Sequence, residues 1–212
     1  MSDDMKIKVT KDGPYMVSGG VPLKDETLKK DSMGKPEKWM ENGDLSTNST
    51  YALCRCGKST NKPFCTGDHA GFDGTETTKR NAFDERARVC AENGNVVLLQ
   101  DPNLCIGAGF CHGKYYVDKT VMKNNTLDIA LQQTYDCAGG SLLIKIDGVP
   151  QEPKLDKSIA MTSAQRPGAL LVKGGIQVES ADGYNYEQRN RIALCSCGRS
   201  RNKPFCDGAH LR

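Results

Sequence analysis

The chain has 212 residues, of which 37% are hydrophobic and 26% charged, with a formal net charge of +3. This length fits one domain or two to three small ones, and the low hydrophobic content argues against one large core. No run of about 18 apolar residues occurs, so we expect no membrane-spanning helix. Residues 1–6 lack the basic and apolar stretches of a secretory signal, so a cytoplasmic protein with reduced thiols is expected.

The first expected elements lie before the first cysteines. Residues 13–21 form a short apolar run closed by Gly19-Gly20, which predicts a strand and a turn. Residues 168–176 repeat this run and end in a second Gly-Gly pair. Residues 24–49 are polar and include the only tryptophan, Trp39, so we expect a surface insertion there.

A cysteine-rich loop follows, and it occurs twice in the chain. The spacing Cys54-x-Cys56-x8-Cys65-x3-His69 recurs as Cys195-x-Cys197-x8-Cys206-x3-His210. Both copies contain the sequences Ala-Leu-Cys-x-Cys-Gly and Asn-Lys-Pro-Phe-Cys. A disulfide framework would leave the two equivalent histidines unexplained, so the repeat indicates two metal sites.

The segment between the repeats, about residues 85–147, has a different pattern. Residues 95–99 and 142–146 are apolar runs that predict two strands. Thr126 fits the N-cap of a helix that carries Leu127, Ala130, Leu131, Thr134 and Tyr135 on one face. Three cysteines lie between the two strands, which gives the order strand, cysteine loop, helix, cysteine, strand.

The last segment combines the second cysteine loop with the basic excess of the chain. Asp207 follows Cys206 and predicts the cap of a short helix leading to His210, whereas the first copy has Thr66 there. The basic residues are Arg189, Arg191, Arg199, Arg201 and Lys203. Such a patch could guide an acidic redox partner, although a solvated surface is the simpler interpretation. Few aromatic residues are interleaved, which disfavours nucleic-acid binding.

The thiol spacing distinguishes two kinds of metal chemistry. Structural zinc usually binds cysteine pairs that are two to four residues apart, whereas the first pair of each copy is Cys-x-Cys. This close pair suits two sulfurs on one iron of a 2Fe–2S cluster, with the later cysteine and histidine on the second iron. The spacing therefore favours an iron–sulfur cluster, and zinc remains the alternative.

Residues 195–210 strongly resemble the CDGSH iron–sulfur (mitoNEET-like) family, in which Cys-Asp-Gly-x-His closes a 2Fe–2S site of three cysteines and one histidine. Residues 54–69 have the same spacing but end in Cys-Thr-Gly-Asp-His. The resemblance implies a strand-exchanged β-sandwich of two units. It also implies two ligand sets: Cys54, Cys56, Cys65 and His69, and Cys195, Cys197, Cys206 and His210.

The middle segment resembles the divergent single-cluster ferredoxins. Residues 101–111 look like the ferredoxin cluster loop with Ala108 in place of its second cysteine, and residues 137–140 look like the closing Cys-Pro-x-Gly with alanine in place of proline. The resemblance implies a 3Fe–4S cluster, or a 4Fe–4S cluster completed by another group, on Cys105, Cys111 and Cys137. The simpler alternative is that these are ordinary buried thiols.

Two further side chains could complete the middle cluster. Cys90 lies before a strand at no familiar spacing, so a buried small side chain is the simpler interpretation. His112 directly follows Cys111 and more simply adjusts the surroundings of the cluster by hydrogen bonding.

These observations predict an α+β protein in which two β-rich CDGSH units, residues 1–84 and 148–212, form a pseudo-symmetric β-sandwich pair around an inserted ferredoxin-like domain, residues 85–147. The expected function is multi-cluster electron transfer with redox protein partners such as a reductase or oxidoreductase, without nucleic acid or membrane. No catalytic triad, phosphate-binding loop or nucleotide fingerprint occurs, so we expect no enzyme in its own right. A redox or iron sensor, or a cluster donor, is the alternative, and a structural zinc module is less favoured. The oligomeric state, and whether the units pair within or between chains, stay open.

Overall fold

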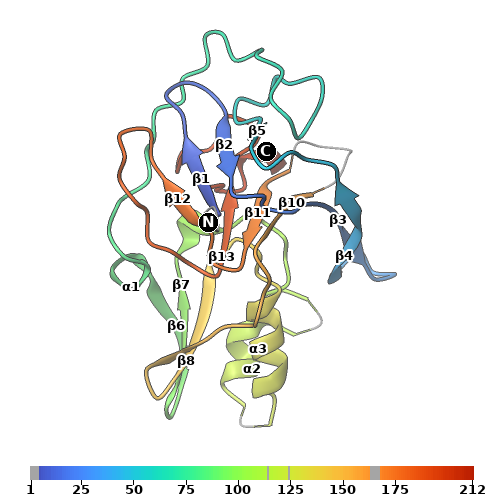
Figure 1. Cartoon of the computed structure of the whole chain (residues 1–212). Coiled ribbons are helices and arrows are strands. Elements are labelled where there is room, and N and C mark those ends of the chain that lie inside the picture. The colour runs from blue at the N-terminus through green and yellow to red at the C-terminus, as the bar shows by residue number, and fades with distance from the viewer. Residues whose placement is uncertain (1–4, 114, 124, 163–167) are drawn as a thin grey trace.

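The computed structural model describes residues 5–113, 115–123, 125–162 and 168–212, and these residues form three sheets (Figure 1). The first sheet has the order β12-β1-β2-β5, with β1 at Lys6–Val9, β2 at Tyr15–Ser18, β5 at Tyr51–Leu53 and β12 at Gln177–Glu179. The second has the order β13-β11-β10-β3-β4, with β3 at Leu23–Lys30, β4 at Pro36–Leu45, β10 at Ser158–Thr162, β11 at Leu170–Lys173 and β13 at Arg191–Leu194. The third has the order β6-β7-β8-β9, with β6 at Arg88–Asn93, β7 at Val96–Gln100, β8 at Leu142–Ile146 and β9 at Val149–Gln151.

The described helices are short. They are α1 at Phe83–Arg86, α2 at Val117–Val121, α3 at Leu127–Tyr135 and the 3₁₀ turns η1 at Pro102–Leu104 and η2 at Ala209–Leu211. None of them is long and apolar enough to cross a membrane. Residues 1–4, which belong to the start that lacks a secretory pattern, lie outside the described residues.

The first two sheets are related by an exchange of strands between the two copies of the repeat. In the first copy, β2 lies antiparallel between β1 and β5, and in the second copy β11 lies antiparallel between β10 and β13. The next strand of each copy leaves its own sheet: β3 pairs in parallel with β10, and β12 pairs in parallel with β1. The two copies therefore pair within one chain, a point that the sequence left open, and they exchange strands as the family resemblance implies.

The second sheet is buried on both faces. Leu170 and Val172 of β11 belong to the main core, which also contains the buried residues of β1 and β2. Leu171 points to the other face and packs with Ile106 and Ala138 of the middle segment. Successive strand residues face opposite sides of a sheet, so three consecutive buried residues in β11 indicate that both faces of the sheet are covered. The middle segment is thus docked on the second copy.

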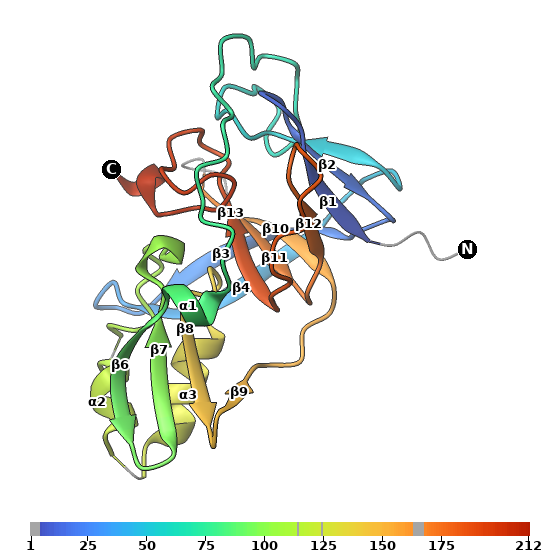
Figure 2. The same ribbon diagram turned by 90° about the vertical axis from the view of Figure 1, so that its left-hand side faces the viewer.

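The middle segment contains the predicted elements. The strands expected at 95–99 and 142–146 are β7 and β8, and the helix expected after Thr126 is α3. Thr126 occupies the N-cap position, although its side chain does not cap the helix. Figure 2 shows α2 and α3 on one face of this sheet, where apolar residues of β7, β8, α2 and α3 form a separate small core. The sheet continues through β9, beyond residue 147.

The polar segment expected as a surface insertion forms a regular hairpin. Strands β3 and β4 pair antiparallel, and most residues of β4 are exposed. The hairpin nevertheless contacts the middle segment, because Trp39 Nε1 donates to the carbonyl of Asp136 at 3.0 Å and its ring lies 5.8 Å from that of Phe110. Near the turn of the hairpin, Lys35 Nζ donates to the carbonyl of Gly113 at 3.1 Å. The hairpin therefore helps to hold the middle segment against the second copy.

Candidate metal centres

The two cysteine loops are held by the same backbone hydrogen bonds. In the first loop, the amide of Cys54 donates to the carbonyl of Pro63 at 2.7 Å, and that of Cys65 donates to Ala52 at 2.9 Å. In the second loop, Cys195 donates to Pro204 at 2.9 Å and Cys206 to Ala193 at 2.8 Å. A serine hydroxyl in each loop, Ser59 or Ser200, also donates to the carbonyl of the following phenylalanine. The repeated sequence thus encodes a repeated loop conformation.

Each loop brings two thiols together at the end of a strand. The Sγ atoms of Cys54 and Cys56 lie 3.8 Å apart, and those of Cys195 and Cys197 lie 3.7 Å apart. A tetrahedral metal ion with metal–sulfur bonds of about 2.3 Å separates two of its sulfur ligands by about 3.8 Å. Both pairs therefore have the spacing that two thiolates on one metal ion require.

The remaining cysteine and histidine of each loop form a second pair. Cys65 Sγ lies 3.6 Å from Nδ1 of His69, and Cys206 Sγ lies 3.3 Å from Nδ1 of His210. A tetrahedral ion with sulfur and imidazole ligands separates these atoms by about 3.6 Å. Burial lowers the pKa of His210, which keeps the imidazole neutral and able to bind metal.

The two pairs of a loop do not converge on one point. Among the described residues, no three histidine, cysteine or acidic side chains come close enough together to hold a single metal ion. A structural zinc site would bring all four ligands around one ion. A 2Fe–2S cluster takes one pair of ligands on each of its two irons, and the pair distances in both loops fit that arrangement.

The thiols are protonated to different degrees before metal binds. The hydrogen bond between Cys195 and Cys197 lowers the pKa of Cys197 and raises that of Cys195, so the pair shares a proton. Burial raises the pKa of Cys206 to about 12. Amide groups point at three of the sulfurs: Lys58 N lies 3.4 Å from Cys56 Sγ, Gly67 N lies 3.4 Å from Cys65 Sγ, and Gly208 N lies 3.4 Å from Cys206 Sγ. Metal binding must release the thiol protons, and these amides then stabilise the thiolates.

The outer segments match a family model described as "iron-binding zinc finger CDGSH type", over residues 12–70 and 167–211. The two outer segments belong to the CDGSH family. No curated protein and no solved structure matches the chain significantly. CDGSH domains bind iron–sulfur clusters, in agreement with the paired ligands of both loops.

The two CDGSH loops touch each other at their Cys-x-Cys pairs. Cys56 and Cys197 form an isolated antiparallel bridge. A Cβ at Gly57 would lie 2.7 Å from the carbonyl oxygen of Cys197, and one at Gly198 would lie 2.6 Å from that of Cys56. Both glycines also have positive φ, so these positions require glycine for two reasons, the backbone conformation and the lack of space for a Cβ. This reciprocal contact is that of a pseudo-twofold pair, and it brings the two CDGSH sites side by side.

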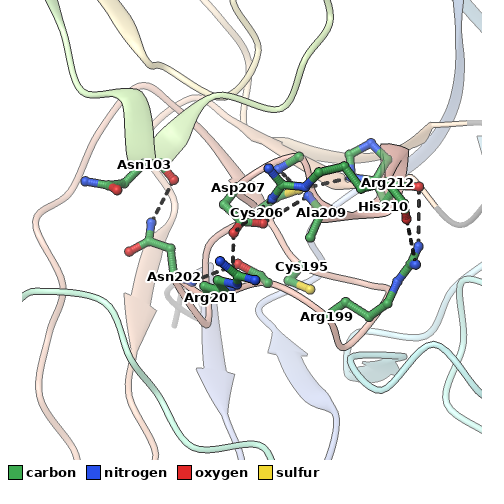
Figure 3. Close-up of polar contacts among 12 residues, drawn as sticks. Asn103, Cys195, Arg199, Arg201, Asn202, Cys206, Asp207, Ala209, His210 and Arg212 are labelled. Atoms are coloured by element: carbon green, nitrogen blue, oxygen red, sulfur yellow. Dashed lines mark hydrogen bonds and ion pairs between the residues drawn. The ribbon is translucent and has the colours of Figure 1, made fainter.

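The surroundings of the two CDGSH sites differ. Thr66, Gly67 and Asp68 of the first loop are exposed, whereas the equivalent Gly208 and Ala209 are buried. Figure 3 shows the second loop, in which the carboxylate of Asp207 accepts from the amide of Ala209 at 3.0 Å. The N-cap of η2 is Gly208 and no side chain caps it, so the expectation that Asp207 caps this helix is wrong. The second loop is covered because the middle segment docks on the second copy.

Two residues near the CDGSH sites were not apparent from the ligand spacing. The hydroxyl of Tyr15, in the first copy, donates at 2.9 Å to the carbonyls of both Cys195 and Pro204 in the second loop. The guanidinium of Arg55, between two cysteines of the first loop, is buried over the rings of Tyr15 and Phe72. The second copy has Leu170 and Ser196 at these positions. The two repeats are otherwise similar, so the different residue types at these two positions were the sequence feature that could have pointed to Tyr15 and Arg55.

The basic residues of the last segment do not form one surface patch. Arg191 is buried, and its guanidinium donates to the carbonyls of Thr134, Tyr135 and Cys137. Arg189 is half-buried, with its guanidinium over the ring of Phe83. Only the residues within the second ligand loop remain to form a basic surface, so the expected patch is smaller than the sequence suggested.

The three middle cysteines lie around one pocket. Cys105, Cys111 and Cys137 line it together with Ala108 and Ala138. Burial raises the pKa of Cys111 to about 11, and the other two thiols add to this shift because their charges are nearby. The arrangement fits a cluster with three thiolate ligands and an apolar wall at the fourth position.

The closing glycines of the middle site allow close backbone contacts. A Cβ at Gly139 would lie 2.4 Å from the carbonyl oxygen of Leu104, and one at Gly140 would lie 2.2 Å from that of Arg191. Gly140 also has φ of +62°. These contacts fix the Cys137 turn against both η1 and β13.

Neither Cys90 nor His112 is among the described residues that line the three-cysteine pocket. Cys90 is exposed on β6, with its Sγ 3.7 Å from Oε1 of Gln100, so the expectation that it is a buried side chain is wrong. The Nδ1 atom of His112 lies 3.7 Å from Cys111 Sγ, and its ring packs edge-on to Tyr116. His112 therefore adjoins a candidate ligand.

Proposed function

We propose that the chain is an electron carrier with three iron–sulfur clusters. Each CDGSH site holds one 2Fe–2S cluster, and the middle site holds a 3Fe–4S cluster. The observation that carries this proposal is the pairing of ligands in both loops, with sulfur–sulfur and sulfur–nitrogen distances suited to one metal ion per pair. When bound, each cluster supplies one-electron exchange.

The protein groups around the sites have separate tasks in this proposal. Amides at Gly67 and Gly208 stabilise negative charge on the sulfurs, which makes reduction easier. The neutral imidazoles of His69 and His210 each replace a thiolate and raise the reduction potential. Tyr15 keeps the second loop in place from the other copy. The exposed end of the first loop allows a redox protein partner to approach.

For the middle site, the pocket supports three irons over four. Ala108 stands where a fourth thiolate would come from, and Cys90 and His112 lie outside the described lining of the pocket. A 4Fe–4S cluster would need a ligand from solvent or from another molecule, and it remains the alternative for this site.

The test is the metal and sulfide content of protein purified without oxygen. We expect about seven irons per chain with matching acid-labile sulfide and no stoichiometric zinc. EPR should give a three-iron signal in the oxidised protein, replaced after dithionite by reduced 2Fe–2S signals. About four irons without the three-iron signal would remove the middle cluster. Zinc without sulfide would overturn electron transfer altogether.

Exchange of a ligand histidine should lower one reduction potential. His69→Cys and His210→Cys each add a negative thiolate, so the midpoint potential of the affected cluster should fall by at least about 59 mV, a tenfold change in the one-electron equilibrium. Potentiometric titration followed by EPR measures both clusters. His112→Ala is the control and should leave both 2Fe–2S potentials unchanged. Unchanged potentials in both cysteine variants would remove the histidines from the ligand sets.

The exposure of residues 66–68 favours a second candidate function, a redox or iron sensor that donates its cluster. A histidine ligand beside an open surface can be protonated and released more easily than a thiolate. Transfer of the first cluster to an apo-acceptor at mildly acidic pH would support the sensor. Retention of the cluster with rapid reversible reduction would support the carrier.

A further inference from the structure

The second CDGSH loop is in direct contact with the loop of the middle site. A Cβ at Gly208, two residues from both Cys206 and His210, would lie 3.0 Å from the carbonyl oxygen of Cys105. The side chain of Cys206 packs in one apolar cluster with Ile106 and Ala138, the neighbours of two middle cysteines. The candidate ligands of the two sites are therefore separated by only a few atoms.

A hydrogen bond strengthens this junction on one side. The side-chain amide of Asn202 donates to the carbonyl of Asn103 at 3.0 Å, and Figure 3 shows the two residues facing each other. Asn103 belongs to η1, which leads directly into Cys105. The second loop and the middle loop thus contact each other at two points, at Gly208 and Cys105 and at Asn202 and Asn103.

On its other side, the second loop meets the first loop through the bridge between Cys56 and Cys197. The middle segment meets the first copy at Lys35 and Trp39 of the β3–β4 hairpin and through the ion pair of Lys145 with Asp84, and these contacts lie outside the first cysteine loop. The order of contact between ligand loops is therefore middle, second, first.

The exposure of the thiols also distinguishes the second site from the two end sites. The thiols of Cys195, Cys197 and Cys206 are all buried and His210 is half-buried, so the thiols of the second site are shielded from a partner. Cys56 and Cys65 of the first site are half-buried, and so are the three middle cysteines. The thiols of the two end sites are therefore more accessible than those of the site between them.

We propose that the second CDGSH site is an internal relay between the middle site and the first CDGSH site. This proposal rests on the proposed function and adds the order of the sites. A one-electron reductant protein reduces one end site, which then passes its electron to the second site. The second site is reduced by one electron as the end site is reoxidised, and the same exchange continues to the other end and to an acceptor protein. No bond is made or broken, and tunnelling slows steeply with distance, so transfer follows the order of contact.

The first test is the magnetic interaction between reduced clusters. A paramagnetic middle cluster shortens the spin relaxation of a neighbouring 2Fe–2S cluster, which raises the microwave power needed to saturate its EPR signal. The two 2Fe–2S signals are assigned from the variants His69→Cys and His210→Cys. In the native protein the second signal should saturate at higher power than the first, and loss of the middle cluster in Cys111→Ala should lower that power. An effect on the first signal alone would overturn the relay order.

A matched pair of glycine variants tests the junction itself. Gly208 and Gly67 have φ of +77° and +88°, so alanine strains both backbones similarly. A Cβ at Gly67 meets nothing within 4 Å among the described residues, whereas one at Gly208 meets Cys105. Gly208→Ala should reduce the power difference between the two signals, and Gly67→Ala should preserve it. Equal effects of the two variants would overturn the junction.

The outcomes separate this inference from the proposed function. Absence of iron–sulfur signals in the native protein would refute the proposed function. Normal signals that all relax independently would refute only the relay. If Gly208→Ala loses its second cluster, the comparison of native protein with Cys111→Ala still decides the order.

Discussion

Replacing Cys111 with alanine is expected to remove the middle cluster, a loss of about three of about seven irons per chain. Cys111 lines one pocket with Cys105 and Cys137, and burial together with the nearby charges of those thiols raises the pKa of Cys111. A three-iron cluster with three thiolate ligands cannot be held by two. The two CDGSH sites should retain their iron, since none of their candidate ligands changes. Iron and sulfide analysis with EPR measures both effects.

Cys90→Ala is the matched control for this experiment. Cys90 lies on β6 with its thiol exposed and turned to Gln100, outside the described lining of the three-cysteine pocket. Its replacement should change neither the iron content nor the three-iron signal. Equal iron loss in both variants would make Cys90 a ligand, and no loss in either would leave the middle thiols as ordinary packing residues.

Local patterns in the sequence predicted the elements of the middle segment well. Its strands β7 and β8 are short apolar runs, and α3 has an apolar face that follows the helical period. The ligand loops were predictable for a different reason. The short spacing of the cysteines and the histidine along the chain indicates which side chains pair on a metal. The same spacing occurs twice, so the second copy supports the interpretation of the first.

The exchange of strands was expected only from a family resemblance. Strand β3 pairs with β10, more than a hundred residues away, and no local feature of its polar sequence specifies that partner. Its pairing depends on the sheet edge that β10 presents once the second copy has folded. The β4 hairpin is polar because it is exposed, and polarity alone does not distinguish a hairpin from an irregular insertion.

The buried polar residues could not be predicted from the sequence at all. Tyr15, Arg55 and Arg191 are fully or almost fully buried, and the described partners of each include main-chain carbonyls. A charged residue usually lies on the surface, and only the fold shows which carbonyls compensate for its burial. The same limit explains why the expected basic patch included Arg191.

Replacing Arg191 with methionine should have the largest effect on stability. The Arg191 guanidinium donates to three carbonyls at the C-terminal end of α3, and its Nε donates to Glu152 at 2.9 Å. A positive charge at this end also favours the helix dipole. Methionine keeps the apolar stem but leaves these acceptors without their donor, so the free energy of unfolding should fall by about 3–5 kcal/mol. Urea unfolding of the holo-protein, followed by circular dichroism, measures the change.

Arg88→Met provides the control, because Arg88 is exposed and the described hydrogen bond of its side chain goes to Gln100 at 3.0 Å. Its loss should change stability by no more than about 0.5 kcal/mol. Arg191 also donates to the carbonyl of Cys137 itself, so Arg191→Met should loosen the middle cluster before the CDGSH clusters as urea is raised. Similar unfolding midpoints for the two variants would show that Arg191 does not join the middle segment to the second copy. Early loss of the three-iron signal in Arg191→Met alone would show that this buried arginine supports the middle site from β13.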